Sequence, residues 1–64
     1  MSMSDRVREL RKEAGLDQQQ LADRASVSMQ TISNLETGRL RDIKLSTISR
    51  LAEALGVTTN DLLG

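Results

Sequence analysis

A helix-start signature that occurs three times constrains this chain more than any other feature. In each copy, a residue suited to cap a helix follows one apolar residue and precedes another by four positions, so the two apolar side chains can pack across the cap. The copies are Leu16, Asp17 and Leu21; Val27, Ser28 and Ile32; and Val57, Thr58 and Leu62. Gln20 and Asp61 stand three residues after their caps, which completes a capping box in the first and third copies. We therefore expect several short helices.

Glycines and apolar spacing predict where these helices lie. Gly15, Gly38 and Gly56 stand where helices can end in the left-handed conformation. Apolar residues spaced by three and four predict helices over residues 4–14 and 45–55, the second with a stripe of Leu45, Ile48, Leu51, Ala52 and Leu55. A helix over residues 17–25 is too short to be stable alone, so packing must hold it against the next helix, where small Ala22 and Ala25 allow close approach. The outline over about residues 17–37 is a helix-turn-helix.

Composition excludes several classes of protein. The 64 residues include no Cys and no His, which excludes disulfides and the common transition-metal sites, and we expect no cofactor. Apolar runs of two or three residues are too short for a membrane span or a signal peptide, so we expect one cytoplasmic domain over residues 1–64. The Ser, Lys and acidic residues show no spacing that pairs a nucleophile with a base, so we expect no enzymatic activity.

The helix that opens after Ser28 has an outward face without any charge. Its inward side carries Ile32 and Leu35, and its outward side carries Met29, Gln30, Ser33, Asn34 and Thr37. An amide can accept from N6 and donate to N7 of adenine at once, so Gln30 and Asn34, four residues apart on one face, are predicted to read base edges. The alternatives are an ordinary polar surface helix, or one amide that only supports Gln18 or bonds to a phosphate.

Charge and aromatic content favour duplex DNA over other nucleic acids. Nine basic and nine acidic residues give a formal net charge of zero, but Arg39, Arg41 and Lys44 are three cations within six residues, directly after the helix whose outward face is uncharged. We expect these three cations to contact phosphates, with a solvated loop as the alternative. The chain has no Phe, Tyr or Trp, so stacking of unpaired bases on aromatic rings is excluded.

From Arg6 to Leu63 the chain resembles the phage repressor-like helix-turn-helix family, the Cro/cI-type or XRE-type DNA-binding domains. The residues that carry the resemblance are Leu10, Arg11, Gly15, Leu16, Gln18, Leu21, Ala22, Val27, Ser28, Thr31, Ile32, Ser33, Leu35, Glu36, Gly38, the segment 51–57, Asp61, Leu62 and Leu63. The resemblance implies a compact all-α domain of five helices. It also implies a transcriptional regulator, expected to be a repressor, that binds double-stranded DNA.

The resemblance also implies roles for single residues. Residues 29–37 become the recognition helix, whose N-terminal part enters the major groove, and Gln18 binds a phosphate from the start of the preceding helix. Met29 stands where relatives carry a polar or basic residue, and a thymine methyl is the base group that Met suits. The DNA-binding set is Gln18, Ser28, Met29, Gln30, Thr31, Asn34, Thr37, Arg39, Arg41 and Lys44.

The resemblance further pairs Arg11 with Glu36 in a partly buried salt bridge. The sequence gives a separate reason: Glu36 is the only charge between Arg24 and Arg39, and it follows the inward residue Leu35. A carboxylate on that side of a helix needs a cationic partner. The alternative is that both side chains are exposed. The remaining charges of residues 5–13 are interpreted as a solvated face.

The resulting hypothesis is a repressor that binds a near-palindromic operator as a homodimer, with no membrane and no small-molecule ligand. A domain this small buries too little surface alone for tight specific binding, and apolar residues around Val57, Leu62 and Leu63 are candidates for a subunit contact or for the core. The chain is either a complete small regulator or the DNA-binding part of a longer one. The competing hypothesis is a protein-interaction module of the same fold, antitoxin-like or polymerase-contacting, which zero net charge would suit.

Overall fold

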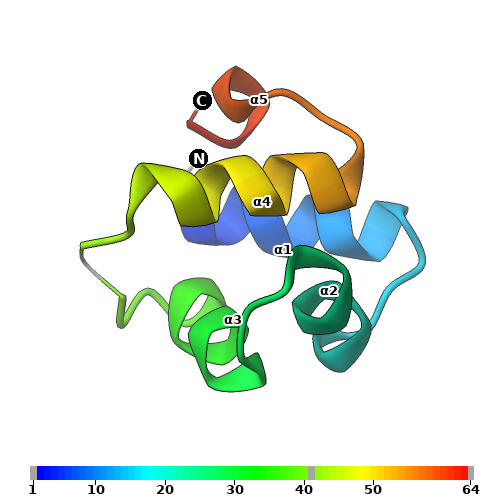
Figure 1. Cartoon of the computed structure of the whole chain (residues 1–64), viewed down its shortest axis with the longest axis horizontal. Helices are drawn as coiled ribbons and strands as arrows, with labels where there is room; N and C mark the ends of the chain where they lie inside the picture. Colours follow the sequence, from blue (N-terminus) through cyan, green and yellow to red (C-terminus); the bar gives the residue numbers. More distant parts are fainter. Residues whose placement is uncertain (1, 41, 64) are drawn as a thin grey trace.

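The computed structural model describes residues 2–40 and 42–63, and these residues form helices without any strand. The helices are α1 (Met3–Glu13), α2 (Gln18–Ala25), α3 (Met29–Glu36), α4 (Leu45–Leu55) and α5 (Thr59–Leu63). The predicted all-α fold class is therefore confirmed (Figure 1). No helix in the described part of the chain is long and apolar enough to span a membrane.

The capping residues act as the sequence predicts. Asp17 Oδ1 accepts from the Gln20 backbone N–H at 2.7 Å, and Gln20 Oε1 accepts from the Asp17 N–H at 2.9 Å. The equivalent reciprocal bonds join Thr58 and Asp61 at 3.2 and 2.9 Å. The hydrogen bond from the Thr58 backbone is the main cause that lowers the pKa of the Asp61 carboxyl, and the bond from the Thr58 side chain is the second cause. Ser28 Oγ accepts from the Thr31 N–H at 3.1 Å and caps α3.

Four helices are followed by a residue in the left-handed conformation. This residue is a glycine after α1, α3 and α4, and a serine after α2. Gly15, Gly38 and Gly56 have φ of 73°, 78° and 71°, as predicted. The sequence did not predict that Ser26, at the end of α2, adopts φ 57°. Its N–H bonds to the carbonyl oxygen of Asp23, as the Gly56 N–H bonds to that of Glu53. The turn between α2 and α3 therefore uses a conformation that is unfavourable for a residue with a Cβ.

One apolar core joins all the helices. Its buried members are Val7, Leu16, Leu21, Ala22, Ala25, Ile32, Leu35, Ile48, Leu51, Ala52 and Leu62. The predicted apolar stripe of α4 is wrong at Leu45, which is 69% exposed. Leu55, at the other end of the stripe, is half-buried. As the first residue of α4, Leu45 lies at the margin of the molecule, where the loop enters the helix (Figure 1).

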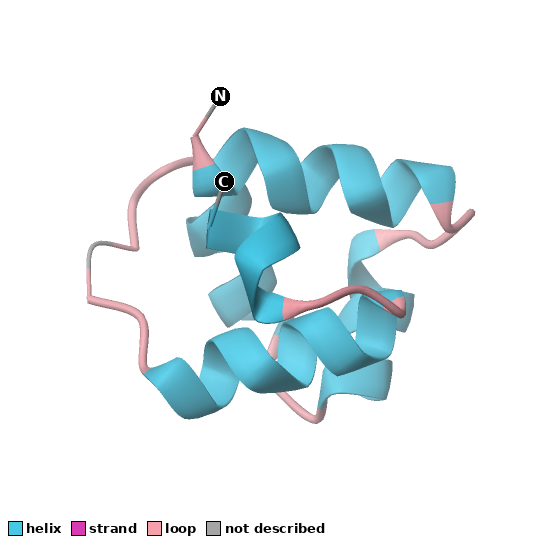
Figure 2. Cartoon of the chain, turned by 90° about the horizontal axis from the view of Figure 1, so that it is seen from above, coloured by secondary structure: helices cyan, strands magenta, loops and turns pink. Residues whose placement is uncertain are grey.

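The helices lie in three levels, which determines the position of α3. In Figure 1, α5 lies above α1 and α4, and α2 and α3 lie below them. Seen from above, α1 and α4 lie on either side of α5 (Figure 2). Contacts join α2 to α3 and α4, α1 to α3 and α5, and α4 to α5. The uncharged face of α3 is therefore turned away from α5, at the opposite end of the molecule.

Candidate nucleic-acid interface

The two sides of α3 differ as the sequence predicts for a helix with one face in the core. Ile32 and Leu35 are buried, and Met29 and Gln30 are exposed. Met29 is one of the few large apolar residues with substantial exposure, at 45%. Asn34 is half-buried at the border between the two sides. The exposed face thus offers amide groups and one flexible apolar side chain, which are groups suited to base edges and to a thymine methyl.

The amides of Gln30 and Asn34 bond to each other on this face. Gln30 Nε2 donates to Asn34 Oδ1 at 3.0 Å. This bond occupies one of the two N–H groups of Gln30, so its Oε1 and its second N–H stay available. Asn34 keeps both of its N–H groups. The structure therefore brings together the two residues that the sequence predicts to read bases.

The hydroxyl groups of the predicted set bond mainly within α3. Ser28 Oγ and Thr31 Oγ1 lie 2.8 Å apart and share one hydrogen bond, so one hydroxyl proton of the pair is left for an outside acceptor. Thr37 Oγ1 donates toward the carbonyl oxygens of Ser33 and Asn34, at 2.9 and 3.2 Å. Ser28 and Thr37 are exposed and Thr31 is half-buried. The Thr37 hydroxyl could donate to a phosphate only if it gave up its bonds to these two carbonyl oxygens.

A buried ion pair lies under the other side of α3. Arg11 Nε donates to Glu36 Oε2 at 2.7 Å and Nη2 donates to Oε1 at 3.1 Å, which gives a two-point contact. The two side chains are 12% and 3% exposed. The hydrogen bond to Glu36 is the main cause that raises the pKa of the Arg11 guanidinium, against the lowering effect of burial. The structure thus pairs the two residues that the resemblance pairs.

Further donors surround this ion pair. Gln18 Nε2 donates to Glu36 Oε1 at 3.3 Å, Arg11 Nη1 donates to the carbonyl oxygen of Leu16 at 2.8 Å, and Arg8 Nη1 donates to that of Glu36 at 3.1 Å. No buried side-chain nitrogen or oxygen of the described residues lacks a partner. Gln18 is therefore held by α3 through one N–H and keeps a second N–H for the phosphate contact that the resemblance implies.

Arg8 is the residue of this network that the sequence analysis missed. Its side chain is 43% exposed and also pairs with Asp5, at 2.7 Å, so the charged face of α1 is only partly a solvated surface. Arg8 precedes Arg11 by three residues, which places both arginines on one side of α1. The last turn of α3 contains no basic residue of its own. Together these two facts were the available signal that α1 supplies cations to the end of α3.

Exposed cations lie in the loop that follows α3. Arg39 and Lys44 are exposed, and among residues 2–40 and 42–63 neither forms an ion pair. The Arg39 N–H donates to the carbonyl oxygen of Asn34 at 2.8 Å, which fixes this residue to the end of the helix. Lys44 precedes α4, and no side chain caps that helix. Arg41, the third predicted phosphate contact, lies outside the described residues.

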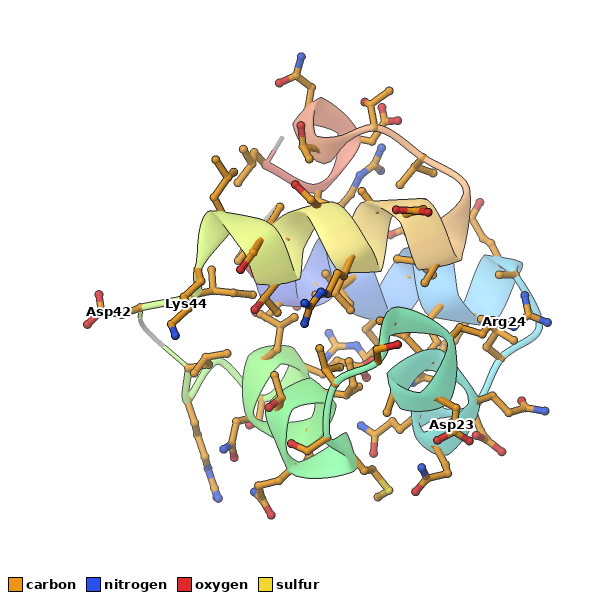
Figure 3. The ribbon with its side chains drawn as sticks, viewed as in Figure 1. Asp23, Arg24, Asp42 and Lys44 are labelled. Carbon is orange, nitrogen blue, oxygen red and sulfur yellow. The ribbon has the colours of Figure 1, made fainter. Side chains whose placement is uncertain are left out.

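Figure 3 shows where the labelled charges lie. Asp42 and Lys44 project from the loop on one side of the molecule, and Asp23 and Arg24 project from α2 on the opposite side.

A cation before the first turn of a helix opposes the positive end of the helix dipole, so Lys44 weakens the start of α4. An anion bound there would reverse this effect. Within the described part of the chain, the loop after α3 thus holds two exposed cations without an ion-pair partner, Arg39 next to the end of α3 and Lys44 before the start of α4.

Comparisons with known proteins agree with this geometry. The family described as Helix-turn-helix matches residues 7–62. The HTH-type transcriptional regulator DdrOP3 of Deinococcus deserti is 41% identical over 63 residues, covering 98% of this chain and 48% of that protein. The immunity repressor protein of Bacillus phage phi105 is 34% identical over 64 residues, covering 100% and 44%. An uncharacterized HTH-type transcriptional regulator of Methanothermobacter thermautotrophicus is 50% identical over 50 residues, covering 78% and 71%.

Solved structures show the same arrangement of helices. The restriction-modification controller protein C.AhdI of Aeromonas hydrophila superposes with a TM-score of 0.90 at 33% identity, covering 95% of this chain and 91% of that one. A chain of the SinR protein/SinI protein complex gives a TM-score of 0.91 at 24% identity, covering 95% and 59%, and shows the fold alone. The present chain spans slightly less than half the length of DdrOP3 and of the phage repressor.

Proposed function

This chain belongs to the helix-turn-helix family, and we propose that it is a DNA-binding transcriptional regulator that recognises a specific duplex sequence and acts as a repressor. The observation that carries the proposal is the exposed face of α3. It has no charge, it presents the amides of Gln30 and Asn34, and the loop that follows carries exposed Arg39 near its start and exposed Lys44 at its end. An uncharged amide face flanked by cations suits base edges flanked by phosphates.

In this proposal α3 lies in the major groove and the residues around it hold the backbone. Met29 and Gln30 lie at the start of α3, the part of a recognition helix that reaches base edges in this motif. Gln18, Arg39 and Lys44 contact phosphates on either side, Gln18 through the N–H that Glu36 does not occupy. Ser28 and Thr31 contribute the one hydroxyl proton left by their own hydrogen bond.

A second copy of the chain completes the binding unit in this proposal. Leu63 is 59% exposed and Leu45 is 69% exposed, and in Figures 1 and 2 the end of α5 and the start of α4 lie on the same side of the molecule. Of the other residues predicted for a subunit contact, Leu62 is buried in the core and Val57 is half-buried against it. A homodimer through Leu45 and Leu63 would bind a near-palindromic operator in the cytoplasm.

The experiment starts by selecting bound duplexes from a random pool. Fluorescence anisotropy then measures the affinity for the selected duplex and for a scrambled one, at two salt concentrations. We expect binding that weakens steeply with salt and that favours the selected duplex, because phosphate contacts release counterions and base contacts give preference. An absence of binding to either duplex at low salt would overturn the proposal and would favour a protein partner.

A further inference from the structure

The two residues of the amide pair on α3 differ in how firmly their backbones are held. The backbone carbonyl oxygen of Asn34 accepts from the N–H groups of Arg39 and Leu40, at 2.8 and 3.2 Å, and from Thr37 Oγ1 at 3.2 Å, which fixes the backbone of this last turn. Asn34 is also half-buried, whereas Gln30 is exposed in the first turn of the helix. Among the described residues, the bond to Asn34 is the side-chain hydrogen bond that Gln30 makes. Asn34 is therefore the less exposed partner of this bond, on the better-held part of the backbone.

We propose that Asn34 is a positioning residue for Gln30, so that Gln30 reads adenine and Asn34 presents mainly donors to a neighbouring base pair. This inference rests on the proposed function. The amide oxygen of Asn has two lone pairs and its nitrogen carries two N–H groups. Because Asn34 Oδ1 accepts from Gln30, one of its lone pairs is occupied, whereas both N–H groups of Nδ2 stay free. While this bond holds, Asn34 therefore offers mainly donors to a base.

The chemistry of the free groups then predicts two adjacent preferences. Gln30 keeps Oε1 as an acceptor for adenine N6 and one N–H as a donor to adenine N7. Asn34 keeps two donors, which match an acceptor such as O6 or N7 of guanine or O4 of thymine. The expected operator therefore has adenine at the position that Gln30 reads and guanine or thymine at the position that Asn34 reads.

The bond between the amides also reduces the entropy lost on binding. A free Gln side chain loses rotamer freedom when it is held against a base. Gln30 is already held at 3.0 Å from Asn34 before DNA binds, so less of that freedom remains to be lost. An exposed neutral hydrogen bond adds little to the stability of the fold. Removing it should therefore change base preference without changing the melting temperature.

The test compares Gln30→Ala, Asn34→Ala and the double variant on duplexes in which each base of the selected site is changed in turn. We expect Asn34→Ala to flatten the preference at two positions, its own and that of Gln30, by about tenfold or more at the adenine, which is the discrimination of one good amide–base pair. For the preferred duplex, the fold-loss of affinity in the double variant should be smaller than the product of the fold-losses in the two single variants. Ser33→Ala, a half-buried neighbour without a side-chain bond to the pair, is the matched control and should change neither position.

Asn34→Asp separates positioning from reading. Its carboxylate can still accept the Gln30 N–H, so the preference for adenine should survive, while the added negative charge weakens binding to all sequences alike. In the free protein, the Gln30 side-chain amide signals in an NMR spectrum should move in Asn34→Ala and stay in place in Ser33→Ala. These signals report the bond before any DNA is added.

Two results would overturn the inference, and they differ in what else they overturn. If Asn34→Ala flattens only its own base position and the Gln30 amide signals do not move, Asn34 does not position Gln30, and the proposed function still stands. If the unaltered protein binds every duplex in the panel equally, the proposed sequence recognition fails, and this inference fails with it.

Discussion

The inner and outer sides of α3 hold polar groups in opposite ways. On the inner side, the Glu36 carboxylate is 3% exposed and is held by Arg11 and Gln18, with Arg8 on its backbone oxygen. On the outer side, the amides of Gln30 and Asn34 have each other, and the helix face around them is open. A helix of eight residues thus carries a fully bonded charged site and a partly unbonded neutral site.

This difference assigns different tasks to the two sides. A buried carboxylate that lost its partners would be strongly destabilising, so the inner side fixes where α3 lies relative to α1 and α2. An exposed amide that loses its partner can bond to water, so the outer side is free to exchange its bonds for bonds to a ligand. Substitutions on the inner side should change stability first, and substitutions on the outer side should change binding first.

The largest effect is expected from breaking the buried ion pair. Glu36→Gln leaves the Arg11 guanidinium with a neutral partner, and Arg11→Met leaves the Glu36 carboxylate without its cation. Each change should lower the free energy of unfolding by about 3–5 kcal/mol, the usual loss when one partner of a buried pair is removed. In a domain of this size that is a large part of the whole stability. Urea or thermal unfolding followed by circular dichroism measures the change.

Glu13→Gln is the matched control for this prediction. Glu13 is exposed at the end of α1 and has no ion pair in the described structure, so its replacement should shift the unfolding free energy by less than about 0.5 kcal/mol. Equal and small effects of Glu13→Gln and Glu36→Gln would mean that the inner side of α3 does not fix its position.

Much of the fold could be predicted because it depends on neighbours in sequence. The caps at Asp17, Ser28 and Thr58 bond to groups three residues away, and the apolar spacing of α3 assigns Ile32 and Leu35 to the core. Such features follow from helix geometry alone. The outward set of α3 was predictable only in part: Met29, Gln30 and Thr37 are exposed, but Ser33 and Asn34 are half-buried.

Features that depend on how the helices pack were less accessible. Gln18 and Arg8 bond to Glu36 across 18 and 28 residues of sequence, and spacing along a helix does not show which groups meet over such separations. Leu45 fits the apolar stripe of α4 by spacing, but as the first residue of the helix it is 69% exposed. Ser26 shows a further limit, because the turn imposes a left-handed conformation on a residue that does not favour it.

A smaller effect is expected at the exposed cations of the loop that follows α3. Arg39→Ala and Lys44→Ala should each reduce the magnitude of the salt slope of DNA binding by about 0.9 and weaken preferred and scrambled duplexes alike. The reason is that each exposed cation is assigned one phosphate. Arg24→Ala removes an exposed cation from the opposite side of the molecule and should leave the slope unchanged (Figure 3). A changed base preference with an unchanged slope would make the altered residue a base reader.

The smallest effects are expected at the left-handed residues that end α2 and α4, and the first of them is Ser26 in the turn that leads into α3. Ser26→Gly should raise the free energy of unfolding by about 0.5–1 kcal/mol, because glycine adopts φ 57° without the cost that a Cβ adds, and its greater freedom in the unfolded chain cancels only part of the gain. Chemical unfolding of the variant measures the change, and DNA affinity should stay the same because both sides of α3 are untouched.

Gly56→Ala makes the reverse change at the end of α4, because it replaces a left-handed glycine by a residue with a Cβ. A Cβ built at Gly56 meets no atom within 4 Å, so the expected loss of about 1 kcal/mol comes from the left-handed backbone alone. If Ser26→Gly raises the free energy of unfolding and Gly56→Ala lowers it, the two turns differ only in which residue occupies the same conformation. If Ser26→Gly instead destabilises the fold, the Ser26 side chain holds the turn by a contact. The position of α3 would then depend on the turn as well as on the inner side of the helix.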